Sequence, residues 1–321
     1  MTRDRIEGAP RVVALGGGHG LSVSLAALRR VTDALTAVVT VADDGGSSGR
    51  LRSELAALPP GDLRMAQAAL AGADSESELW ARLFQYRFPG PGSLGGHAIG
   101  NLVLAGLCDL LGNPVDALDA TGRLLGAAGR VLPASCQAVD IVADVSGLDQ
   151  SDPMRLVQVR GQHEVAATQG RVQGVRLLPD PPSACPQAVA AVREAEWVVL
   201  GPGSLFTSVM PHLLVPELAA AVLAPQVRRV LVLNLAPQVG ETSGFSPPAH
   251  LEALAAQVPA LRLDVVLADP SAVPDVAELA SSAARLGAQL RLEAIAVQGH
   301  PRHDPDRLAK SFADLMGSGG S

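Results

Sequence analysis

Short apolar runs alternate with helix-like segments over much of the chain. Residues 11–15 and 35–41 are strand-like, and the segment between them, residues 21–30, has apolar positions at helical spacing. Three further strand-like runs, each set between helical segments, lie at residues 197–200, 230–234 and 263–267. Strands that alternate with helices at both ends of the chain predict an α/β fold: a Rossmann-like, doubly wound, mainly parallel sheet with helices on both faces.

The middle of the chain departs from this alternation. Helical signals dominate up to residue 126, and Ser75 with Glu78 three positions later has the spacing of a helix-capping box. Beyond this helical region, short β-like runs are separated by Gly, Asp and Ser. We therefore expect one large α/β domain, residues 1–321, built from a first half, a mixed β-containing insertion and a second half at residues 11–126, 131–178 and 186–316.

The amino-acid composition argues against several classes of ligand and of phosphate-binding loop. Apolar residues make up 48% of the chain, but there are only five Phe, two Trp and one Tyr among 321 residues, so stacking of a nucleobase on aromatic rings is disfavoured. A net charge of −7 disfavours general nucleic-acid binding. The only lysine is Lys310, so the Walker-type phosphate loop, whose lysine directly follows the glycines, is excluded.

The cysteines and the longest apolar runs bear on the cellular compartment. Cys108, Cys136 and Cys185 are widely spaced and form no pattern of metal ligands, which favours a reduced, cytoplasmic protein. No stretch approaches the roughly 18 uninterrupted apolar residues of a membrane-spanning helix. We expect no membrane span.

A glycine-rich segment, the first glycine loop (residues 16–20), follows the first predicted strand and opens a helix. Ligands of doubly wound sheets bind at the carboxyl ends of the strands. Main-chain amides at a helix N-terminus suit a phosphate, and here they belong to Gly17, Gly18, His19 and Gly20. A tight turn that needs glycine only for steric reasons is the alternative. The spacing G-x-G-x-x-G is not met, which disfavours a dinucleotide-dependent dehydrogenase.

The second predicted strand ends in the acidic loop, residues 43–49. Asp43 and Asp44 repel each other, so a cation, a ribose diol or amide donors would hold both charges in a concave site. Gly46, Ser47 and Ser48 complete a turn that can approach a phosphate closely. A solvated turn is the alternative. The loop also matches the hydrolase pattern G-x-S-x-G, but a charged segment precedes the serine where that motif needs an abrupt exit from the strand.

Two shorter motifs begin helices. In the segment at residues 61–64, Asp62 can cap the helix that follows and Arg64 can reach inward. His97 and Asn101 lie four residues apart at the start of an apolar helix and therefore share one face. A histidine that serves only as a cap is the alternative, while the binding hypothesis makes Asn101 a ligand contact.

The second glycine loop, residues 201–208, follows the strand predicted at 197–200. Its glycines and hydroxyls at a helix start again suit an anionic oxygen, with Gly203, Ser204 and Thr207 as the donors. Two such loops on one sheet predict a ligand with a diphosphate, provided that both loops face the same crevice.

Taken together, these motifs resemble the gluconeogenesis factors of the YvcK type, which are relatives of the 2-phospho-L-lactate transferases. The resemblance also covers residues 234–242 and 302–305 and extends over nearly the whole chain. It implies a cytoplasmic, Rossmann-like regulatory protein that binds a nucleotide sugar such as UDP-N-acetylglucosamine and requires no cofactor. Asn234 and Arg302 join the expected binding residues, with Arg302 pairing with a phosphate.

In that family the role is to support cell shape and peptidoglycan precursor supply during growth on gluconeogenic carbon. The resemblance leaves room for a protein partner in cell-wall precursor synthesis and for a homo-oligomer. The alternative is a magnesium-dependent transferase acting on a deazaflavin, in which Asp43 and Asp44 would hold the metal ion. No segment matches the deazaflavin site of the transferases, so the binding protein is preferred.

Overall fold

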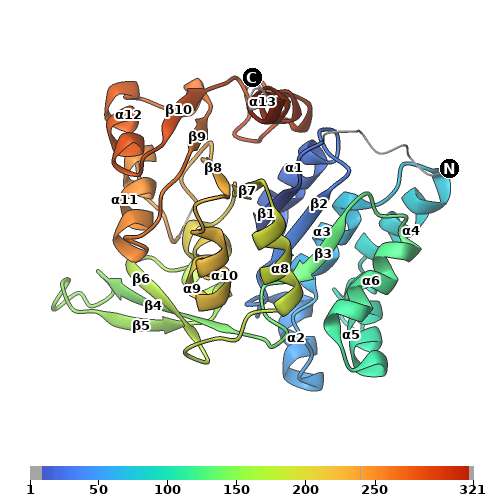
Figure 1. Ribbon diagram of the computed structural model, residues 1–321. Helices are drawn as coiled ribbons and strands as arrows, with labels where there is room; N and C mark the ends of the chain where they lie inside the picture. The colour runs from blue at the N-terminus through green and yellow to red at the C-terminus, as the bar shows by residue number, and fades with distance from the viewer. Residues whose placement is uncertain (1–8, 239, 318–321) are drawn as a thin grey trace.

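A seven-stranded sheet forms the centre of the molecule (Figure 1). The computed structural model describes residues 9–238 and 240–317. All neighbouring strands of this sheet are parallel, in the order β10-β9-β8-β7-β1-β2-β3. The strands are β1 (Val12–Gly16), β2 (Leu35–Val39), β3 (Arg130–Pro133), β7 (Trp197–Leu200), β8 (Arg228–Val232), β9 (Val265–Ala268) and β10 (Gln289–Leu292). The predicted fold class is confirmed.

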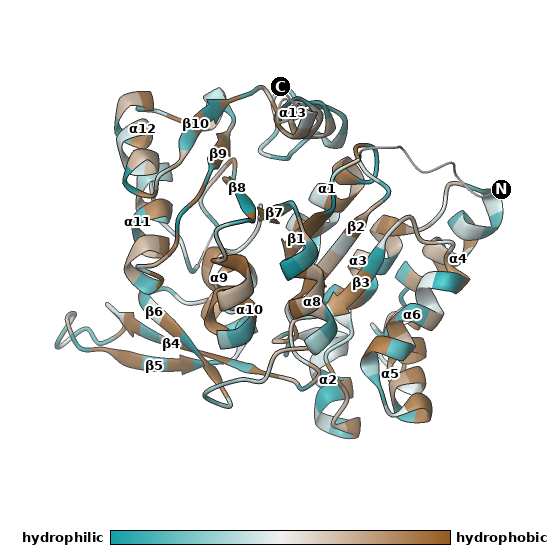
Figure 2. Ribbon diagram, viewed as in Figure 1, coloured by the Kyte–Doolittle hydropathy of each residue, from teal (hydrophilic) through white to brown (hydrophobic). Residues whose placement is uncertain are grey.

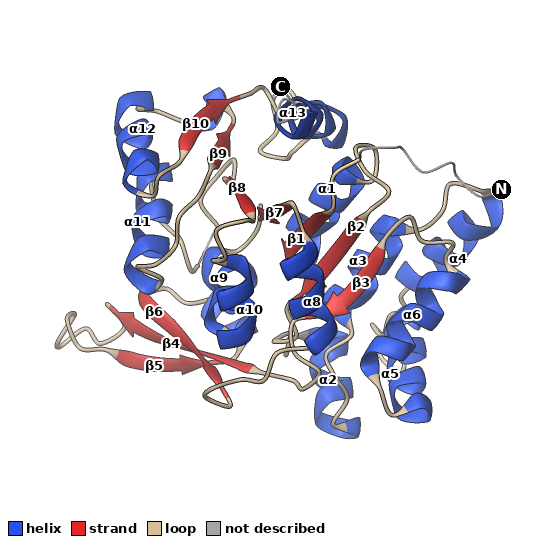
Figure 3. Cartoon of the chain, in the orientation of Figure 1, coloured by secondary structure: helices blue, strands red, loops and turns tan. Residues whose placement is uncertain are grey.

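Helices cover both faces of this sheet (Figure 3). The first half contributes α1 (Gly18–Leu28), α2 (Gly46–Leu55), α3 (Gly61–Leu70), α4 (Ser75–Gln85), α5 (Ile99–Leu111) and α6 (Pro114–Leu124). The second half contributes α8 (Pro186–Glu194), the π-helix η1 (Leu205–Val209), α9 (Met210–Leu214), α10 (Pro216–Val222), α11 (Pro247–Gln257), the short 3-10 turn η2 (Pro270–Ala272), α12 (Val276–Arg285) and α13 (Pro305–Gly317).

A small antiparallel sheet lies at one side of the main sheet, at the lower left of Figure 1. Its order is β5-β4-β6, and its strands are β4 (Asp140–Ser146), β5 (Val157–Arg160) and β6 (Arg171–Leu178), with the one-turn helix α7 (Gln162–Ala166) between the last two. The expected insertion at 131–178 contains this sheet. Residues 131–133, however, belong to β3 of the main sheet.

The main sheet is packed with aliphatic side chains, as the scarcity of aromatic residues requires. Every residue of β1 and β7 is buried, and the strands are the brown, hydrophobic centre of the molecule in Figure 2. Central strands of a parallel sheet are covered on both faces, so they are continuous apolar runs. This explains why these two strands were predictable, whereas β10, whose residues alternate between exposed and partly buried, was not.

One helix start was predicted wrongly. The N-cap of α4 is Asp74, whose side chain accepts hydrogen bonds from the amide and hydroxyl of Ser77 at 2.9 and 2.7 Å. The capping box expected at Ser75 and Glu78 is therefore absent. Aspartate is as good an N-cap as serine, and here it lies one residue earlier.

Among the described residues, no single helix is long and apolar enough to cross a membrane. Only the pair at Leu205–Leu214 and Pro216–Val222 reaches that length and composition, and it does so across a bend of 90°.

The two halves of the chain meet where β1 lies beside β7. The order of the strands reverses here, because β2 and β3 follow on one side of β1 and β7 to β10 on the other. Gly20, in the first turn of α1, has its backbone against the second glycine loop: a Cβ on Gly20 would lie 2.2 Å from the carbonyl oxygen of Pro202. The Ser24 hydroxyl donates to the Gly201 carbonyl at 2.9 Å. The two glycine loops are thus in direct contact at the topological switch point.

We predict that Gly20→Ala lowers the free energy of unfolding by about 1–3 kcal/mol, the usual cost of overpacking, because backbone on both sides must move. The Gly106→Ala variant is the control. Gly106 is exposed on α5 with no atom within 4 Å of an added Cβ, so this change should raise stability by up to about 1 kcal/mol. Urea unfolding measures both; equal stability of Gly20→Ala and wild type would contradict the close contact.

Candidate functional site

The predicted loops lie together at the carboxyl edge of the sheet. The first glycine loop follows β1, the acidic loop follows β2 and the second glycine loop follows β7, and these three strands are neighbours. Asp43 also reaches the start of α3, since a Cβ on Gly61 would lie 2.5 Å from its Oδ2 atom. Both glycine loops therefore lie at the same edge of the sheet, and ligand binding between them stays a prediction.

The first glycine loop is faced by a buried carboxyl group. Gly17 is the N-cap of α1 and Gly18 has φ +58°, so both amides are at the start of the helix. The Asp62 carboxyl lies against them: a Cβ on Gly17 would be 2.4 Å from Asp62 Oδ2. The side chain of His19 is exposed. A phosphate placed on these amides would therefore meet Asp62 as its nearest acidic neighbour.

Asp62 was expected to cap α3, but the N-cap is Pro60 and no side chain caps this helix. Asp62 is 8% exposed, and its Oδ2 atom has no hydrogen-bond partner. Burial, with a smaller contribution from the charge of Asp43, raises the pKa of Asp62 to about 7, while the Gly18 amide and Arg64 oppose the shift. This carboxyl group therefore exchanges its proton near neutral pH.

Arg64 does reach inward, as expected. It is 3% exposed, and its guanidinium group donates to the Gln85 side chain, while its Nε atom has no partner. Burial, followed by the charge of Arg87, lowers the pKa of Arg64 to about 10. Arg64 thus supplies a buried positive charge behind the acidic residues of the site.

The acidic loop carries a hydrogen-bonded cluster of buried polar groups. The Ser47 hydroxyl is 2.9 Å from His97 Nδ1 and accepts a hydrogen bond of 2.9 Å from Asn101 Nδ2. The Ser48 hydroxyl accepts from the Gly61 amide at 3.0 Å. Burial, followed by the charge of Arg50, lowers the pKa of His97. His97 and Asn101 were expected to share one helix face, but α5 begins at Ile99 with Ala98 as its N-cap, so His97 lies before the helix. Both side chains nevertheless contact Ser47.

Asn101 has an unused acceptor. Its side chain is 1% exposed and its Oδ1 atom has no partner, and the same is true of the Thr40 hydroxyl just after β2. A buried polar atom without a hydrogen bond costs about 1–3 kcal/mol of stability. Such atoms beside a glycine loop are consistent with a water molecule or ligand group that completes them.

The two aspartates of the acidic loop have different environments. Asp43 Oδ1 accepts from the Gly45 amide at 3.0 Å, within the loop, and Gly46 beside it is exposed with φ +47°. Asp44 Oδ1 accepts from the His163 amide at 2.9 Å, at the start of α7. Asp44 thus joins the acidic loop to the small sheet.

The described residues contain no group of three His, Cys, Asp or Glu side chains that could hold a metal ion. Magnesium, however, is often held by one or two carboxylates together with substrate phosphates. Asp43 is the better placed of the two, because its charge acts on Asp62, which lies against the first glycine loop, whereas Asp44 is bonded to the main chain of α7. A magnesium ion bound here would neutralise phosphate charge next to the first glycine loop.

The second glycine loop is held by Asn234, which follows β8. Asn234 Oδ1 accepts from the Gly203 amide at 2.9 Å, and its Nδ2 atom donates to the Gly203 carbonyl at 2.8 Å. The Gly203 amide, expected to bind phosphate, is therefore engaged within the protein. Asn234 sets the shape of the loop in this structure.

A second buried carboxyl group, Glu241, faces this loop. It is 2% exposed, and it lies near the hydroxyls of Ser204 and Thr207 and the amides at the start of η1, although neither carboxyl oxygen completes a regular hydrogen bond. Burial raises the pKa of Glu241 to about 7, and the Thr207 hydroxyl and nearby amides oppose the shift. The donors expected to hold a ligand phosphate thus face an acidic group of the protein itself.

Sequence reasoning gave no role to Glu241 or to the Asp62 side chain beyond a helix cap. No local pattern marks Glu241, because its environment comes from residues far away in the chain. Gly240 before it packs against α7, since an added Cβ would lie 1.8 Å from the Ala166 carbonyl oxygen. This contact anchors the turn that carries Glu241.

Arg302 is exposed on the segment after β10. This segment crosses the carboxyl ends of two strands: the Ala296 amide donates to Asp269 Oδ2 at 2.7 Å after β9, and His303 Nε2 is 3.1 Å from the Leu233 carbonyl after β8. Arg302 therefore lies one residue from a contact with the strand end that precedes Asn234. A hollow of about 620 Å³ opens along the same segment, between Leu235 and residues 294–301.

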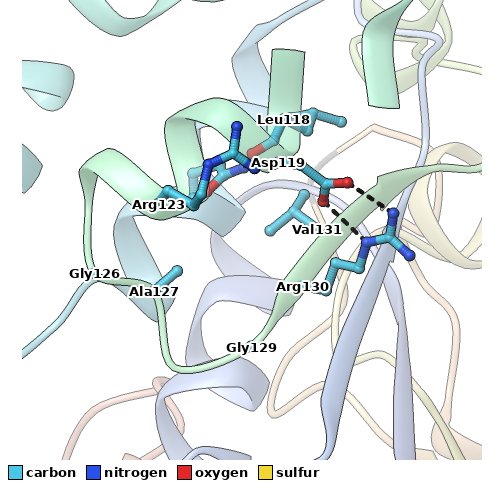
Figure 4. A pocket seen from close by; sticks show the side chains of 10 residues that line it. Leu118, Asp119, Arg123, Gly126, Ala127, Gly129, Arg130 and Val131 are labelled. Carbon is cyan, nitrogen blue, oxygen red and sulfur yellow. Dashed lines mark hydrogen bonds and ion pairs between the residues drawn. The ribbon is translucent and has the colours of Figure 1, made fainter. Parts of the chain in front are cut away.

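A smaller hollow of about 290 Å³ lies at the amino end of β3 (Figure 4). Its wall contains the ion pair between Asp119 and Arg130, with two hydrogen bonds of 2.9 and 2.8 Å. Because this hollow is at an amino end, away from the glycine loops, it is not part of the candidate site.

The fold and these loops define a Rossmann-like α/β protein whose two glycine loops meet at the switch point of its sheet. A family model described as "2-phospho-L-lactate transferase CofD" matches residues 12–299. The chain belongs to this CofD family.

Relatives with assigned names agree with the resemblance found from the motifs. A Mycobacterium tuberculosis protein named "Putative gluconeogenesis factor" is 54% identical over 93% of this chain and 88% of its own length. The "Gluconeogenesis factor" of Bacillus subtilis is 36% identical over 83% of this chain and 80% of its own. A crystal structure of a UPF0052 family protein from Bacillus halodurans has a TM-score of 0.84 and 32% identity, and the match covers 94% of this chain and 97% of that one.

The raised pKa of Asp62 leads to a prediction about how the stability of the folded protein depends on pH. Because its value of about 7 in the folded protein exceeds the ordinary 3.8, the folded state keeps a proton that the unfolded state releases. The stability of wild type relative to Asp62→Asn should therefore be highest below about pH 4 and fall by a few kcal/mol as the pH rises to about 7. Urea unfolding of both proteins across this range measures the difference.

Asp140→Asn provides a control of opposite sign. Against the effect of burial, Arg160 and Arg52 hold the pKa of Asp140 below its ordinary value. The stability of wild type relative to Asp140→Asn should therefore be present at neutral pH and be lost as the pH falls through the pKa of the folded protein. A pH-independent difference for Asp62→Asn would mean that Asp62 is not buried as described.

Proposed function

We propose that this protein binds a nucleotide sugar of the UDP-N-acetylglucosamine type and acts as a regulator. The observation that carries the proposal is the direct contact between the two glycine loops at the switch point of the sheet, through Gly20 and Pro202. A crevice at this place in a doubly wound sheet is where phosphate-bearing ligands bind. The unpartnered acceptors of Asn101 and Thr40 lie along the same edge.

The diphosphate would rest on the amides of Gly17, Gly18, His19 and Gly20 at the N-terminus of α1. Asn101, with its free Oδ1 atom, would accept a hydrogen bond from a ligand hydroxyl or from a bridging water. Arg302, which has an exposed side chain, would pair with a phosphate oxygen. Ser204 and Thr207 would contribute only where Glu241 is protonated or displaced.

The acidic residues at this edge of the sheet would oppose the binding of a negatively charged ligand. Asp43, Asp62 and Glu241 all lie at the edge where the phosphates would bind, and an anionic ligand would be repelled by their charged forms. Binding then requires proton uptake by these carboxyl groups or a magnesium ion between ligand and protein. Magnesium is therefore a proposed companion of the ligand and not a resident cofactor.

The names of the relatives support a role in gluconeogenic metabolism. We extend the proposal to cell shape and peptidoglycan precursor supply under gluconeogenic growth, with a cytoplasmic location and with a regulatory protein partner or a second copy of the chain as the receiver of the signal. The family resemblance supports these parts of the proposal.

The second candidate function is a magnesium-dependent transferase acting on a deazaflavin. The match to the CofD family model favours it, together with the position of Asp43 against the start of α3, where its charge acts on Asp62. In this case Asp43 would hold the ion, and the glycine loops would orient the phosphate group.

Binding is tested by calorimetry with UDP-N-acetylglucosamine, with and without magnesium chloride, and inorganic phosphate as the reference. We expect the sugar nucleotide to bind more tightly than phosphate, and Arg302→Ala to weaken it at least about tenfold, since a lost charge-assisted contact costs about 1.5–3 kcal/mol. Arg82→Ala, on the exposed face of α4, is the control and should bind as wild type does. Affinity no better than that for phosphate, or no change in Arg302→Ala, would count against the proposal.

The transferase is tested by turnover. The protein is incubated with a deazaflavin acceptor, an activated phospholactyl donor and magnesium, and the product is followed by mass spectrometry. If the second candidate is right, product forms and Asp43→Asn reduces its rate at least about a hundredfold, as expected for loss of a metal-mediated contribution of several kcal/mol. The exposed Asp33→Asn is the control. Absence of product with every divalent metal would end this interpretation.

A further inference from the structure

Two cysteines that are far apart in the sequence lie side by side at the end of β3. The Cys185 amide donates to the Ala134 carbonyl at 3.0 Å, which places the backbone before α8 against the segment that leaves β3. Cys136 follows two residues later, and its thiol is within hydrogen-bonding contact of the Cys185 sulfur. Figure 1 shows α8 next to β3. Adjacent backbones with touching sulfurs meet the first requirement for a disulfide.

The two sulfurs have complementary environments. Cys185 is the N-cap of α8 and is fully buried, so the amides of Gln187 and Ala188 at the helix start face its sulfur. Cys136 is exposed. One sulfur is thus open to a reagent in solution, while the other is held at a helix N-terminus, which favours a negative charge.

This geometry shifts the pKa of each of the two cysteines. The hydrogen bond from the Cys136 thiol, together with the amides of α8 and the charge of Arg130, lowers the pKa of Cys185 to about 6 against the effect of burial. The same hydrogen bond, followed by burial, raises the pKa of Cys136. Of the two sulfurs, Cys185 is therefore the one that loses its proton more readily.

We propose that Cys136 and Cys185 form a dithiol site that a peroxide converts reversibly to an intrachain disulfide. The Cys136 proton passes along the hydrogen bond to the Cys185 sulfur, and the exposed Cys136 thiolate that this leaves attacks the peroxide. The O–O bond breaks, the proton passes on from Cys185 to the leaving oxygen, and a sulfenic acid and one alcohol or water molecule result. The Cys185 thiolate then attacks the Cys136 sulfur and displaces hydroxide. The peroxide is reduced, and the two thiols lose two electrons and two protons in total.

The disulfide would act on a segment that borders the candidate site. The segment after β3 runs along the end of β2, with hydrogen bonds from Ala134 to Val39 and from Val139 to Val41 at 2.8 and 3.2 Å. Val41 is two residues from Asp43. A bond between Cys136 and Cys185 would tie this segment to the N-terminus of α8. This inference is independent of the proposed ligand.

The third cysteine provides an internal reference. Cys108 is on α5, and burial raises its pKa, which makes it a poor nucleophile. Treatment of the full chain with hydrogen peroxide should therefore reduce the number of free thiols from three to one, with Cys108 remaining. Peptide mapping should show a Cys136–Cys185 bond, and dithiothreitol should restore all three thiols.

Three cysteine variants distinguish the intrachain disulfide from other oxidation products. Cys108→Ser should form the same bond. Cys185→Ser keeps a good helix cap, and in this variant Cys136 should stop at the sulfenic acid, which dimedone traps, whereas wild type gives little adduct. Cys136→Ser should leave the buried Cys185 unoxidised. Three free thiols after treatment of wild type, a bond between two chains, or equal dimedone labelling of wild type and Cys185→Ser would overturn the proposal.

Discussion

The contact between the backbones of the two glycine loops is the constraint on which the rest of the site depends. Strands β1 and β7 pair directly, and Gly20 approaches the Pro202 carbonyl so closely that no side chain fits between α1 and the second glycine loop. The hydrogen bond from Ser24 to Gly201 joins residues 177 positions apart in a buried place. Because backbone positions in a parallel sheet are set by main-chain hydrogen bonds, the two loops keep their relative positions without large side chains between them.

Each glycine loop faces one buried carboxyl group. Asp62 lies against the start of α1 and Glu241 against the start of η1, and burial raises both pKa values to about 7. Helix N-termini favour the charged form of a carboxyl group, while burial disfavours it, and here burial is the larger effect. The same amides suit a phosphate, so the proposed ligand would compete with these two carboxyl groups for them. Such unpaired polar groups cost stability, and sites that bind or react are where that cost is common.

Sequence motifs predict some of the site residues and miss others, and the difference has a physical reason. The glycine loops were predictable because buried parallel strands are continuous apolar runs, and the residues that follow them are at the ligand edge. His97 and Asn101 were predicted to share one face of a helix, but α5 begins at Ile99 and His97 lies outside it. Their partner Ser47 lies 50 positions before His97, and only the folded chain brings them within 2.9 Å. Asp62 was assigned to a helix cap because its neighbours are typical of a helix start, whereas the cap is Pro60.

The sequence by itself determined the α/β fold, most of the strand and helix positions, the two glycine loops and the family resemblance, because these depend on periodicity and on local residue types. The tertiary structure alone decided that Asp62 and Glu241 face the loops, that Asn234 engages Gly203, and that Cys136 meets Cys185. Burial and long-range contacts change the charge and the hydrogen bonds of a group, and neither is encoded within a short window of sequence. The chemistry of this site is therefore a property of the assembled sheet edge.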